Sequence, residues 1–207
     1  MRAYGAAIMT PPSPDNQVDK NAIDVRLMAR AATGEHAAFQ QLVERHQHAV
    51  VGTVAKMLGN ASEAEDIAQQ VFLRLWKSAP RYKPTAKFTT FLFTITRNLV
   101  FNETRKRQRR KEHSLEEQEE DRFLQIPDTD EPQPDAQLLQ SELQDAVDQA
   151  IANLPEKQRL AVVLRRFEKM PYEEIAVVLE LSVSAVKSQL FRARTALREA
   201  LEKFMGD

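Results

Sequence analysis

Helical periodicity occupies most of the chain and limits the fold more than any other feature. Apolar residues recur at spacings of three and four from Asp24 to about Arg110, and again from Leu138 to Phe204. This is the pattern of helices that bury one face. Five glycines in 207 residues are few for a sheet protein, which needs many tight turns. The sequence therefore predicts an all-α fold.

An acidic segment divides the helical pattern in two. Residues 112–137 hold ten Asp and Glu against a single Arg, together with three prolines that end any helix. This composition is typical of a flexible linker. We therefore expect two small helical domains, residues 21–111 and residues 138–207, joined by a flexible acidic linker. Residues 1–20 are expected to form a flexible N-terminal tail.

Composition excludes several classes of protein. The net charge is near zero, with Lys and Arg 29 against Asp and Glu 30, but the two signs are segregated along the chain. The absence of cysteine excludes disulfides and thiolate metal sites and fits a reducing cytosol. No stretch approaches the roughly 18 apolar residues of a membrane span, and residues 1–16 hold too short an apolar run for a signal peptide. We expect a cytoplasmic protein without membrane insertion of its own.

The second helical stretch contains a pattern typical of a helix-turn-helix. A short helix over residues 172–180 is followed by a turn at residues 181–183 and a long helix, for which Ser182 is suited to be the N-cap. The long helix would bury Val183, Val186, Leu190, Ala193 and Leu197 and would present Ser184, Ala185, Lys187, Ser188, Arg192 and Arg194. Such a helix fits the major groove of DNA. The alternative is an ordinary helical hairpin with a solvated basic face.

The charge of this second stretch is only mildly basic. Residues 154–205 carry ten Lys and Arg against seven Glu. Because phosphate neutralisation supplies most of the affinity for DNA, we expect the isolated domain to bind weakly. A tethered partner would then be needed for tight binding.

Residues 88–110 begin apolar and end strongly basic. The apolar face consists of Phe88, Phe91, Leu92, Ile95 and Leu99, and the preceding loop adds Arg81, Tyr82, Lys83 and Lys87. Six of the residues 105–111 are Lys or Arg, more than the helix dipole alone would favour. Phe93 and Phe101 lie off the apolar face. Two interpretations remain open for them: stacking on unpaired bases or burial against a neighbouring helix.

The helix predicted at residues 62–78 suggests a different partner. Ser62 and Glu65 have the spacing of a capping box. The outer face presents Asp66, Gln69, Gln70, Leu73 and Arg74. A neutral, amide-rich face with an exposed leucine suits a protein contact, although a merely solvated face has the same composition.

Four segments together resemble a known family. In order they are FQQLVERHQHAV, AEDIAQQVFLRLW, FTTFLFTITRN and LPEKQRLAVVLRRFEKMPYEEIAVVLELSVSAVKSQLFRAR. In order and spacing they resemble the motifs of bacterial sigma factors of the extracytoplasmic-function (ECF) group, over about residues 22–204. The resemblance implies a sigma region 2-like bundle over residues 21–111 and a region 4-like helix-turn-helix domain over residues 138–207. It implies a transcription initiation factor that binds core RNA polymerase, directs it to specific promoters in a stress response and assists promoter melting.

The resemblance also implies partners and site residues. Asp66, Gln69, Gln70 and Arg74 would meet the clamp helices of the largest polymerase subunit, and the flap of the second-largest subunit would be a further contact. Arg81, Lys83, Lys87, Asn98, Arg105 and Arg109 would meet the minus-ten promoter element, including its unpaired strand. Ser184, Lys187, Ser188 and Arg192 would meet the minus-thirty-five element. An anti-sigma protein would clamp the two domains, and the acidic linker would run near the RNA exit path.

Three residues depart from the pattern of that family. Phe91 stands where the family often has Trp, and Phe still fills a core. Gln70 replaces a residue that is often acidic, which implies an altered polymerase contact. Asn102 replaces a frequent Asp and with it a local salt bridge or DNA contact.

Two other functions compete with this interpretation. A stand-alone helix-turn-helix regulator would explain the second domain but leaves the basic, aromatic helix of the first domain without a purpose. An enzyme lacks support, because His46 and His48 point to different faces of a helix, unlike the paired histidines of a zinc site. There is also no Gly-rich phosphate loop or nucleophile motif. We therefore expect no catalytic residues, no metal site and no cofactor.

Overall fold

Helices make up the part of the chain that the structure describes. The computed structural model describes residues 15–115 and 135–204. Its segments are α1 (Asp15–Ala32), α2 (His36–Leu58), α3 (Ala61–Ser78), η1 (Ala79–Arg81), α4 (Phe88–Leu115), α5 (Asp135–Ala152), α6 (Glu156–Arg166), α7 (Tyr172–Leu179), α8 (Val183–Ala200) and η2 (Glu202–Phe204). No strand occurs within these residues, and the all-α prediction is confirmed. Helices α4 and α5 extend a few residues into the predicted linker, and the remainder of the linker lies outside the described residues, as does most of the predicted tail.

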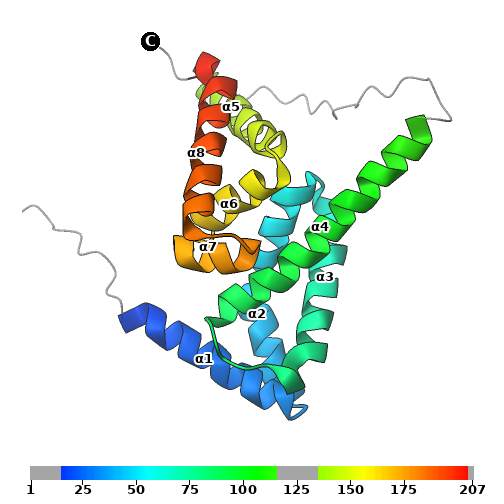
Figure 1. Cartoon of the computed structure of the whole chain (residues 1–207), viewed down its shortest axis with the longest axis vertical. Helices are drawn as coiled ribbons and strands as arrows, with labels where there is room; N and C mark the ends of the chain where they lie inside the picture. Colours follow the sequence, from blue (N-terminus) through cyan, green and yellow to red (C-terminus); the bar gives the residue numbers. More distant parts are fainter. Residues whose placement is uncertain (1–14, 116–134, 205–207) are drawn as a thin grey trace, which may run out of the picture.

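The first bundle consists of α1 to α4 (Figure 1). Helix α2 packs against α1, α3 and α4, because each helix turns one apolar stripe inward. The fully buried side chains at the centre include Met28, Leu42, Val54, Leu75 and Leu92. Buried Asp24 joins α1 to α2, since Arg45 Nε donates to its carboxylate at 2.6 Å and His46 Nε2 lies 3.0 Å from it.

The N-terminus of α3 is capped by Asn60 and not by Ser62. The Asn60 Oδ1 atom accepts hydrogen bonds from the backbone N–H groups of Ser62 at 3.0 Å and Glu63 at 3.4 Å. The predicted capping box of Ser62 and Glu65 is therefore wrong by two residues. The reason lies in the preceding turn, where Gly59 adopts φ 67° to end α2 and leaves Asn60 in the extended conformation of an N-cap.

The second bundle consists of α5 to α8 and contains the predicted helix-turn-helix. Helix α7 ends at Leu179, with Glu180 in the left-handed conformation at φ 54°. Ser182 then caps α8, because its Oγ accepts a hydrogen bond from the backbone N–H of Ala185 at 3.1 Å, as predicted. Helix α8 buries Val186, Leu190 and Ala193 against the bundle.

Helix α4 is covered on two sides. One side carries the predicted apolar face and packs on α2 and α3. The other side consists of Thr90, Phe93, Arg97, Phe101 and Thr104, spaced at three and four residues, which we call the second stripe. Its two phenylalanines are only 3% and 5% exposed. Helix α7 lies against this side of α4 (Figure 1).

The two bundles share one continuous buried core. Helix α6 packs on α2, and α7 packs on α4. The guanidinium of Arg159 reaches from α6 to the C-terminal end of α2 and donates to the carbonyl of Met57 at 2.6 Å. Within the described ranges, no helix is both long enough and apolar enough to cross a membrane.

Candidate nucleic-acid and polymerase interfaces

The outer face of α8 is open and polar. Its predicted DNA-binding residues Ser184, Lys187, Ser188 and Arg192 are all exposed. The Ser188 Oγ donates to the carbonyl of Ser184 at 3.1 Å, which folds this short side chain onto its own helix. A shallow hollow is lined by Lys187, Ser188, Phe191 and Arg192. The exposed face of α8 thus combines small side chains near the start of the helix with two cations, as expected of a recognition helix that enters the major groove.

Sequence reasoning missed Phe191 on this face. Its side chain is 68% exposed, the highest value among the large exposed hydrophobic residues of the described chain. The signal was available, because Phe191 stands four residues after Lys187 and therefore shares its face. An exposed aromatic ring between two cations suits apolar contact with a thymine methyl group.

The predicted minus-ten residues fall into two groups. Arg81, Lys83, Asn98, Arg105 and Arg109 are exposed, and their side chains make no hydrogen bond or ion pair within the described residues. Arg105 and Arg109 belong to the C-terminal part of α4, which projects beyond the bundle (Figure 1). Lys87 differs, because its Nζ lies 2.6 Å from a carboxylate oxygen of Glu174 on α7.

The loop before α4 is anchored by its aromatic residue. Tyr82 is half-buried and its ring lies 5.1 Å from that of Phe91 and 6.3 Å from that of Phe88. Burial, with a smaller contribution from the nearby Asp24 carboxylate, raises the pKa of Tyr82. The tyrosine therefore holds the loop, and Arg81 and Lys83 on either side remain free.

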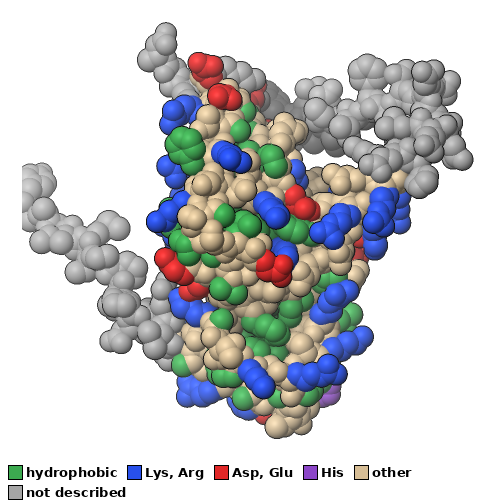
Figure 2. Space-filling view, viewed as in Figure 1, with side chains coloured by type: hydrophobic (Ala, Val, Ile, Leu, Met, Phe, Trp, Pro, Cys, Tyr) green, Lys and Arg blue, Asp and Glu red, His purple; other side chains and the backbone are tan. Residues whose placement is uncertain are grey.

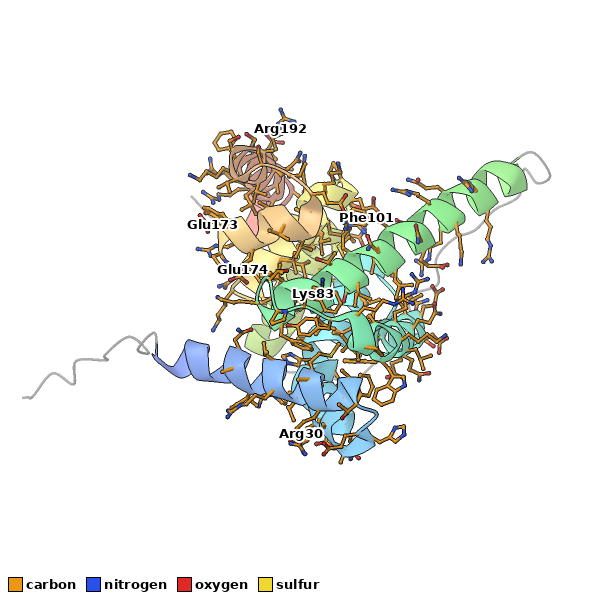
Figure 3. The ribbon with its side chains drawn as sticks, turned by 60° about the horizontal axis from the view of Figure 1, so that its bottom comes forward. Arg30, Lys83, Phe101, Glu173, Glu174 and Arg192 are labelled. Carbon is orange, nitrogen blue, oxygen red and sulfur yellow. The ribbon has the colours of Figure 1, made fainter. Side chains whose placement is uncertain are left out.

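The open question about Phe93 and Phe101 is answered in favour of burial. Both rings lie inside the shared core. Figure 3 shows Phe101 on the side of α4 that is turned toward the second bundle. In this arrangement neither ring is available to an unpaired base.

The outer face of α3 is exposed and unoccupied. The side chains of Asp66, Gln69, Gln70 and Arg74 make no hydrogen bond or ion pair within the described residues. Leu73 in their midst is 59% exposed. An apolar side chain surrounded by amide side chains, one carboxylate and one guanidinium is typical of a protein contact.

A groove on the second bundle was not predicted. It has a volume of about 740 Å³ and lies between α5, α6 and α8. Its floor is apolar, formed by Val147, Ile151, Val162, Leu190 and Leu197, and its rim carries Arg165, Arg166, Lys169 and Arg194. Phe167 at its edge is 42% exposed. No single-helix pattern reveals such a groove, because three helices contribute to it.

Two of the histidines, His36 and His46, have structural partners. His46 lies against buried Asp24, and the ring of His36 stacks on Trp76 with centroids 4.9 Å apart. Within residues 15–115 and 135–204, no group of three or more His, Asp or Glu side chains is arranged to hold a metal ion.

Comparison with known proteins identifies the family. Sigma-70 region 2 matches residues 42–110, and Sigma-70 region 4 matches residues 144–197. The chain is 33% identical over 186 residues to the RNA polymerase sigma-H factor of Pseudomonas aeruginosa, covering 89% of this chain and 96% of that protein. The chain belongs to the ECF group of RNA polymerase sigma factors. The ECF sigma-E factor of Haemophilus influenzae is 30% identical, covering 88% of this chain and 97% of that protein.

Solved sigma factor structures agree with the fold. CnrH in complex with the cytosolic domain of CnrY matches with a TM-score of 0.64 and 26% identity, covering 87% of this chain and 98% of that chain. RpoE of Bartonella quintana in complex with the anti-sigma factor NepR matches with a TM-score of 0.62 and 24% identity, over 79% of this chain and 96% of that chain.

Family membership decides between the functions that the sequence leaves open. As an ECF sigma factor the chain is a transcription initiation factor that works with RNA polymerase, and the stand-alone regulator is set aside. Sigma factors as a family are generally not enzymes.

Proposed function

We propose that this sigma factor contacts promoter DNA through two separate basic faces and core RNA polymerase through α3 and the groove of the second bundle. The α8 face, Ser184, Lys187, Ser188, Phe191 and Arg192, reads the minus-thirty-five element. The minus-ten face consists of Arg81, Lys83 and Lys87 from the segment before α4 and of Asn98, Arg105 and Arg109 from α4, and it meets the minus-ten element and its unpaired strand. The α8 face carries the proposal, since its side chains are exposed and its cations have no partner within the described chain.

The chemistry of the α8 face matches duplex DNA. Ser184 and Ser188 are small enough to let the helix backbone approach base edges. Lys187 and Arg192 supply phosphate contacts or bidentate bonds to guanine. The ring of Phe191 supplies apolar contact with a thymine methyl group.

The polymerase contacts have a different character. On α3 the exposed Leu73 is the apolar anchor, and Gln69 and Gln70 supply neutral hydrogen-bonding groups around it. We assign this face to the clamp helices of the largest subunit. The apolar groove between α5, α6 and α8 fits an apolar segment of the flap of the second-largest subunit, and its four rim cations favour acidic flanking residues.

The proposal includes the domain roles and the setting. Residues 21–111 act at the minus-ten element, and residues 138–207 act at the minus-thirty-five element. The protein works in the cytoplasm, where core polymerase is found, and has no catalytic activity of its own. An anti-sigma protein is a further partner, as NepR is for the similar RpoE.

Run-off transcription with purified core polymerase tests the proposal, with DNA from upstream of the protein's own gene as template. We expect transcripts only when core enzyme and this protein are both present. Lys187→Ala should reduce transcription only on templates with an intact minus-thirty-five element. Arg105→Ala with Arg109→Ala should reduce strand opening, measured by permanganate reactivity of unpaired thymines.

Matched variants separate contact from folding. Leu73→Ala should weaken core binding without changing the helical circular dichroism signal, whereas Lys77→Ala on the same helix should leave core binding unchanged. Transcription that is unaffected by Lys187→Ala, Leu73→Ala and the α4 pair would contradict the assignment of these faces.

A further inference from the structure

The basic end of α4 carries its cations on more than one side of the helix. Asn98, Arg105 and Arg109 are separated by seven and four residues and therefore share one face. Arg107 lies about 200° around the helix axis from Arg105, because successive residues are about 100° apart. Figure 2 shows Lys and Arg side chains along the C-terminal half of α4. The cations of this block therefore cannot all face the same partner.

The side chain of Arg107 is turned toward the first bundle. Its Nη1 atom donates to the backbone carbonyl of Leu58, the last residue of α2, at 2.9 Å. Its Nη2 atom donates to the carboxylate of Glu63 in the first turn of α3. Hydrogen bonds from an ionised donor are roughly twice as strong as those between neutral groups. The guanidinium thus joins α4 to two other helices at once.

Both acceptors belong to residues 58–63, which we call the α2–α3 corner. Gly59 ends α2 at φ 67°, and carbonyl groups at a helix C-terminus lack partners within the helix. The helix dipoles favour a cation at this end of α2 and a carboxylate in the first turn of α3. Asn60 caps α3, and its Nδ2 atom donates to the Glu63 carboxylate at 3.3 Å. Local structure therefore fixes the carbonyl and the carboxylate that Arg107 contacts.

The end of α4 has few other attachments to the first bundle. Phe101 is the last buried residue of α4 among the described side chains, and the helix continues to Leu115. The part beyond Phe101 spans about 20 Å at 1.5 Å per residue. Among the described side chains of this part, only that of Arg107 bonds to another helix of the first bundle. Because helix ends without such contacts fray, this attachment decides where Arg105 and Arg109 point.

We propose that Arg107 is a positioning residue of the minus-ten face, which holds the end of α4 on the α2–α3 corner so that Arg105 and Arg109 point away from the bundle. This inference rests on the proposed function, which assigns Arg105 and Arg109 to the minus-ten element. A helix end that is already held in place loses less conformational freedom when DNA binds. Arg107 thus acts through its two neighbours and touches no phosphate itself.

Two neighbouring polar contacts of α4 do not attach it to α2 or α3. The Nζ atom of Lys106 lies 3.2 Å from the carboxylate of Glu103 on the same helix, and Lys106 is 65% exposed. Such exposed pairs contribute little to stability. Thr104 donates to Glu156 of the second bundle. Lys106 therefore provides a matched control for Arg107, because it carries the same charge at the adjacent position without joining α4 to another helix.

Distance measurement within the first bundle tests the attachment directly. Because the chain has no cysteine, exposed Lys77 of α3 and Arg110 of α4 can be changed to cysteine and labelled for double electron–electron resonance in the full chain. We expect a narrow distance distribution that Arg107→Ala broadens and Lys106→Ala leaves unchanged. The reversed pair Arg107→Glu with Glu63→Arg should be narrower than Arg107→Glu alone. Equal distributions for the parent protein and Arg107→Ala would overturn the proposal.

The salt dependence of DNA binding separates positioning from direct contact. With core polymerase present, Arg107→Ala should weaken binding to a single-stranded minus-ten fragment about three- to tenfold, because the helix end must then be ordered on binding. Its salt dependence should stay that of the parent protein, whereas Arg105→Ala should reduce it by about one counterion. Lys106→Ala should weaken binding less than Arg107→Ala. A salt dependence reduced as much in Arg107→Ala as in Arg105→Ala would show a phosphate contact and overturn the positioning role.

Binding of core polymerase separates positioning from a role in folding alone. Arg107→Ala should bind core polymerase as tightly as the parent protein does, because the bundle core holds the outer face of α3 in place. A parallel loss of core binding and of helical circular dichroism signal would mean that Arg107 only maintains the fold. If Arg107→Ala broadened the distances while Arg105→Ala with Arg109→Ala bound the minus-ten fragment normally, the proposed function of this face would be overturned, and with it the role of Arg107 in DNA binding.

Discussion

Helices α4 and α8 are both long and basic, but protein covers two sides of α4 and only one side of α8. On α4 the bundle core takes one face, the second bundle takes another, and Lys87 is paired with Glu174. On α8 the side chains of the outer cations and of Phe191 make no hydrogen bond or ion pair within the described residues. The comparison shows that a basic face in a sequence indicates affinity for anions, whereas its availability depends on what packs against it.

The largest expected difference between the helices is in the free energy of unfolding when a phenylalanine on each is changed to alanine. Phe101→Ala should lower the free energy of unfolding by about 3 kcal/mol, because its ring is buried in the shared core and its removal leaves a cavity. Phe191→Ala should change it by no more than about 0.5 kcal/mol. Urea unfolding followed by circular dichroism measures both. Similar losses for the two variants would show that α8 is covered in solution.

The next largest expected difference between the two helices concerns the affinity of the free protein for DNA. Lys187→Ala should weaken binding to a minus-thirty-five duplex by about 1–3 kcal/mol and reduce the salt dependence by about one counterion. Lys87→Ala should have a smaller effect on a minus-ten fragment, because the carboxylate of Glu174 already pairs with Lys87 in the free protein. Fluorescence anisotropy at two salt concentrations gives both values, with Arg198→Ala in the last turn of α8 as control. Equal losses would contradict the difference in availability.

The two observed N-caps allow a comparison of local structure. Asn60→Ala at α3 and Ser182→Ala at α8 should each cost about 1 kcal/mol of stability, because each removes acceptors for helix N–H groups. Ser62→Ala should be close to neutral, since Ser62 supplies only its backbone N–H to the cap. Thermal unfolding measures all three. A loss at Ser62 as large as that at Asn60 would restore the predicted capping box.

The smallest expected effects depend on pH and have opposite signs at two glutamates. Burial raises the pKa of Glu168, against smaller opposing contributions from Thr53 and His46. The folded state therefore gains stability as pH falls from that raised pKa toward the ordinary value of 4.5. The lowered pKa of Glu180 does the reverse: its contribution is present above 4.5 and is lost as pH falls through the folded-state pKa.

Replacing each glutamate by glutamine should remove its contribution to the pH dependence of stability. Glu168→Gln should raise the melting temperature at pH 7 and flatten its pH dependence just above pH 4.5. Glu180→Gln should lower the melting temperature slightly at pH 7 and flatten the loss below pH 4.5. Scanning calorimetry between pH 3 and pH 8 compares them. If the melting temperatures of both variants shifted in the same direction at pH 7, the environments assigned to Glu168 and Glu180 would be contradicted.

Local pattern determined much of this protein. The spacing of apolar residues predicted the helices and their inward faces, for example Leu42 and Val50 on α2 and Val186 and Leu190 on α8. Turn chemistry predicted the Ser182 cap. Helical periodicity also separated polar faces from buried ones, so that the exposed positions of Lys187, Arg105 and Gln70 followed from sequence alone. These properties depend on residues within a turn or two of one another, and a sequence displays such neighbours directly.

The tertiary structure decided what covers each face. The pattern placed Phe93 and Phe101 off the main stripe but left base stacking and burial open, because the periodicity of one helix does not reveal which other element packs against it. The pairs Lys87–Glu174 and Arg97–Glu180 join residues more than 80 positions apart, and Arg159 caps a helix about 100 residues away. Such contacts form only when the two bundles close on one another. The sequence by itself thus determined the helices and their chemistry, whereas packing decided which of the basic faces remains open.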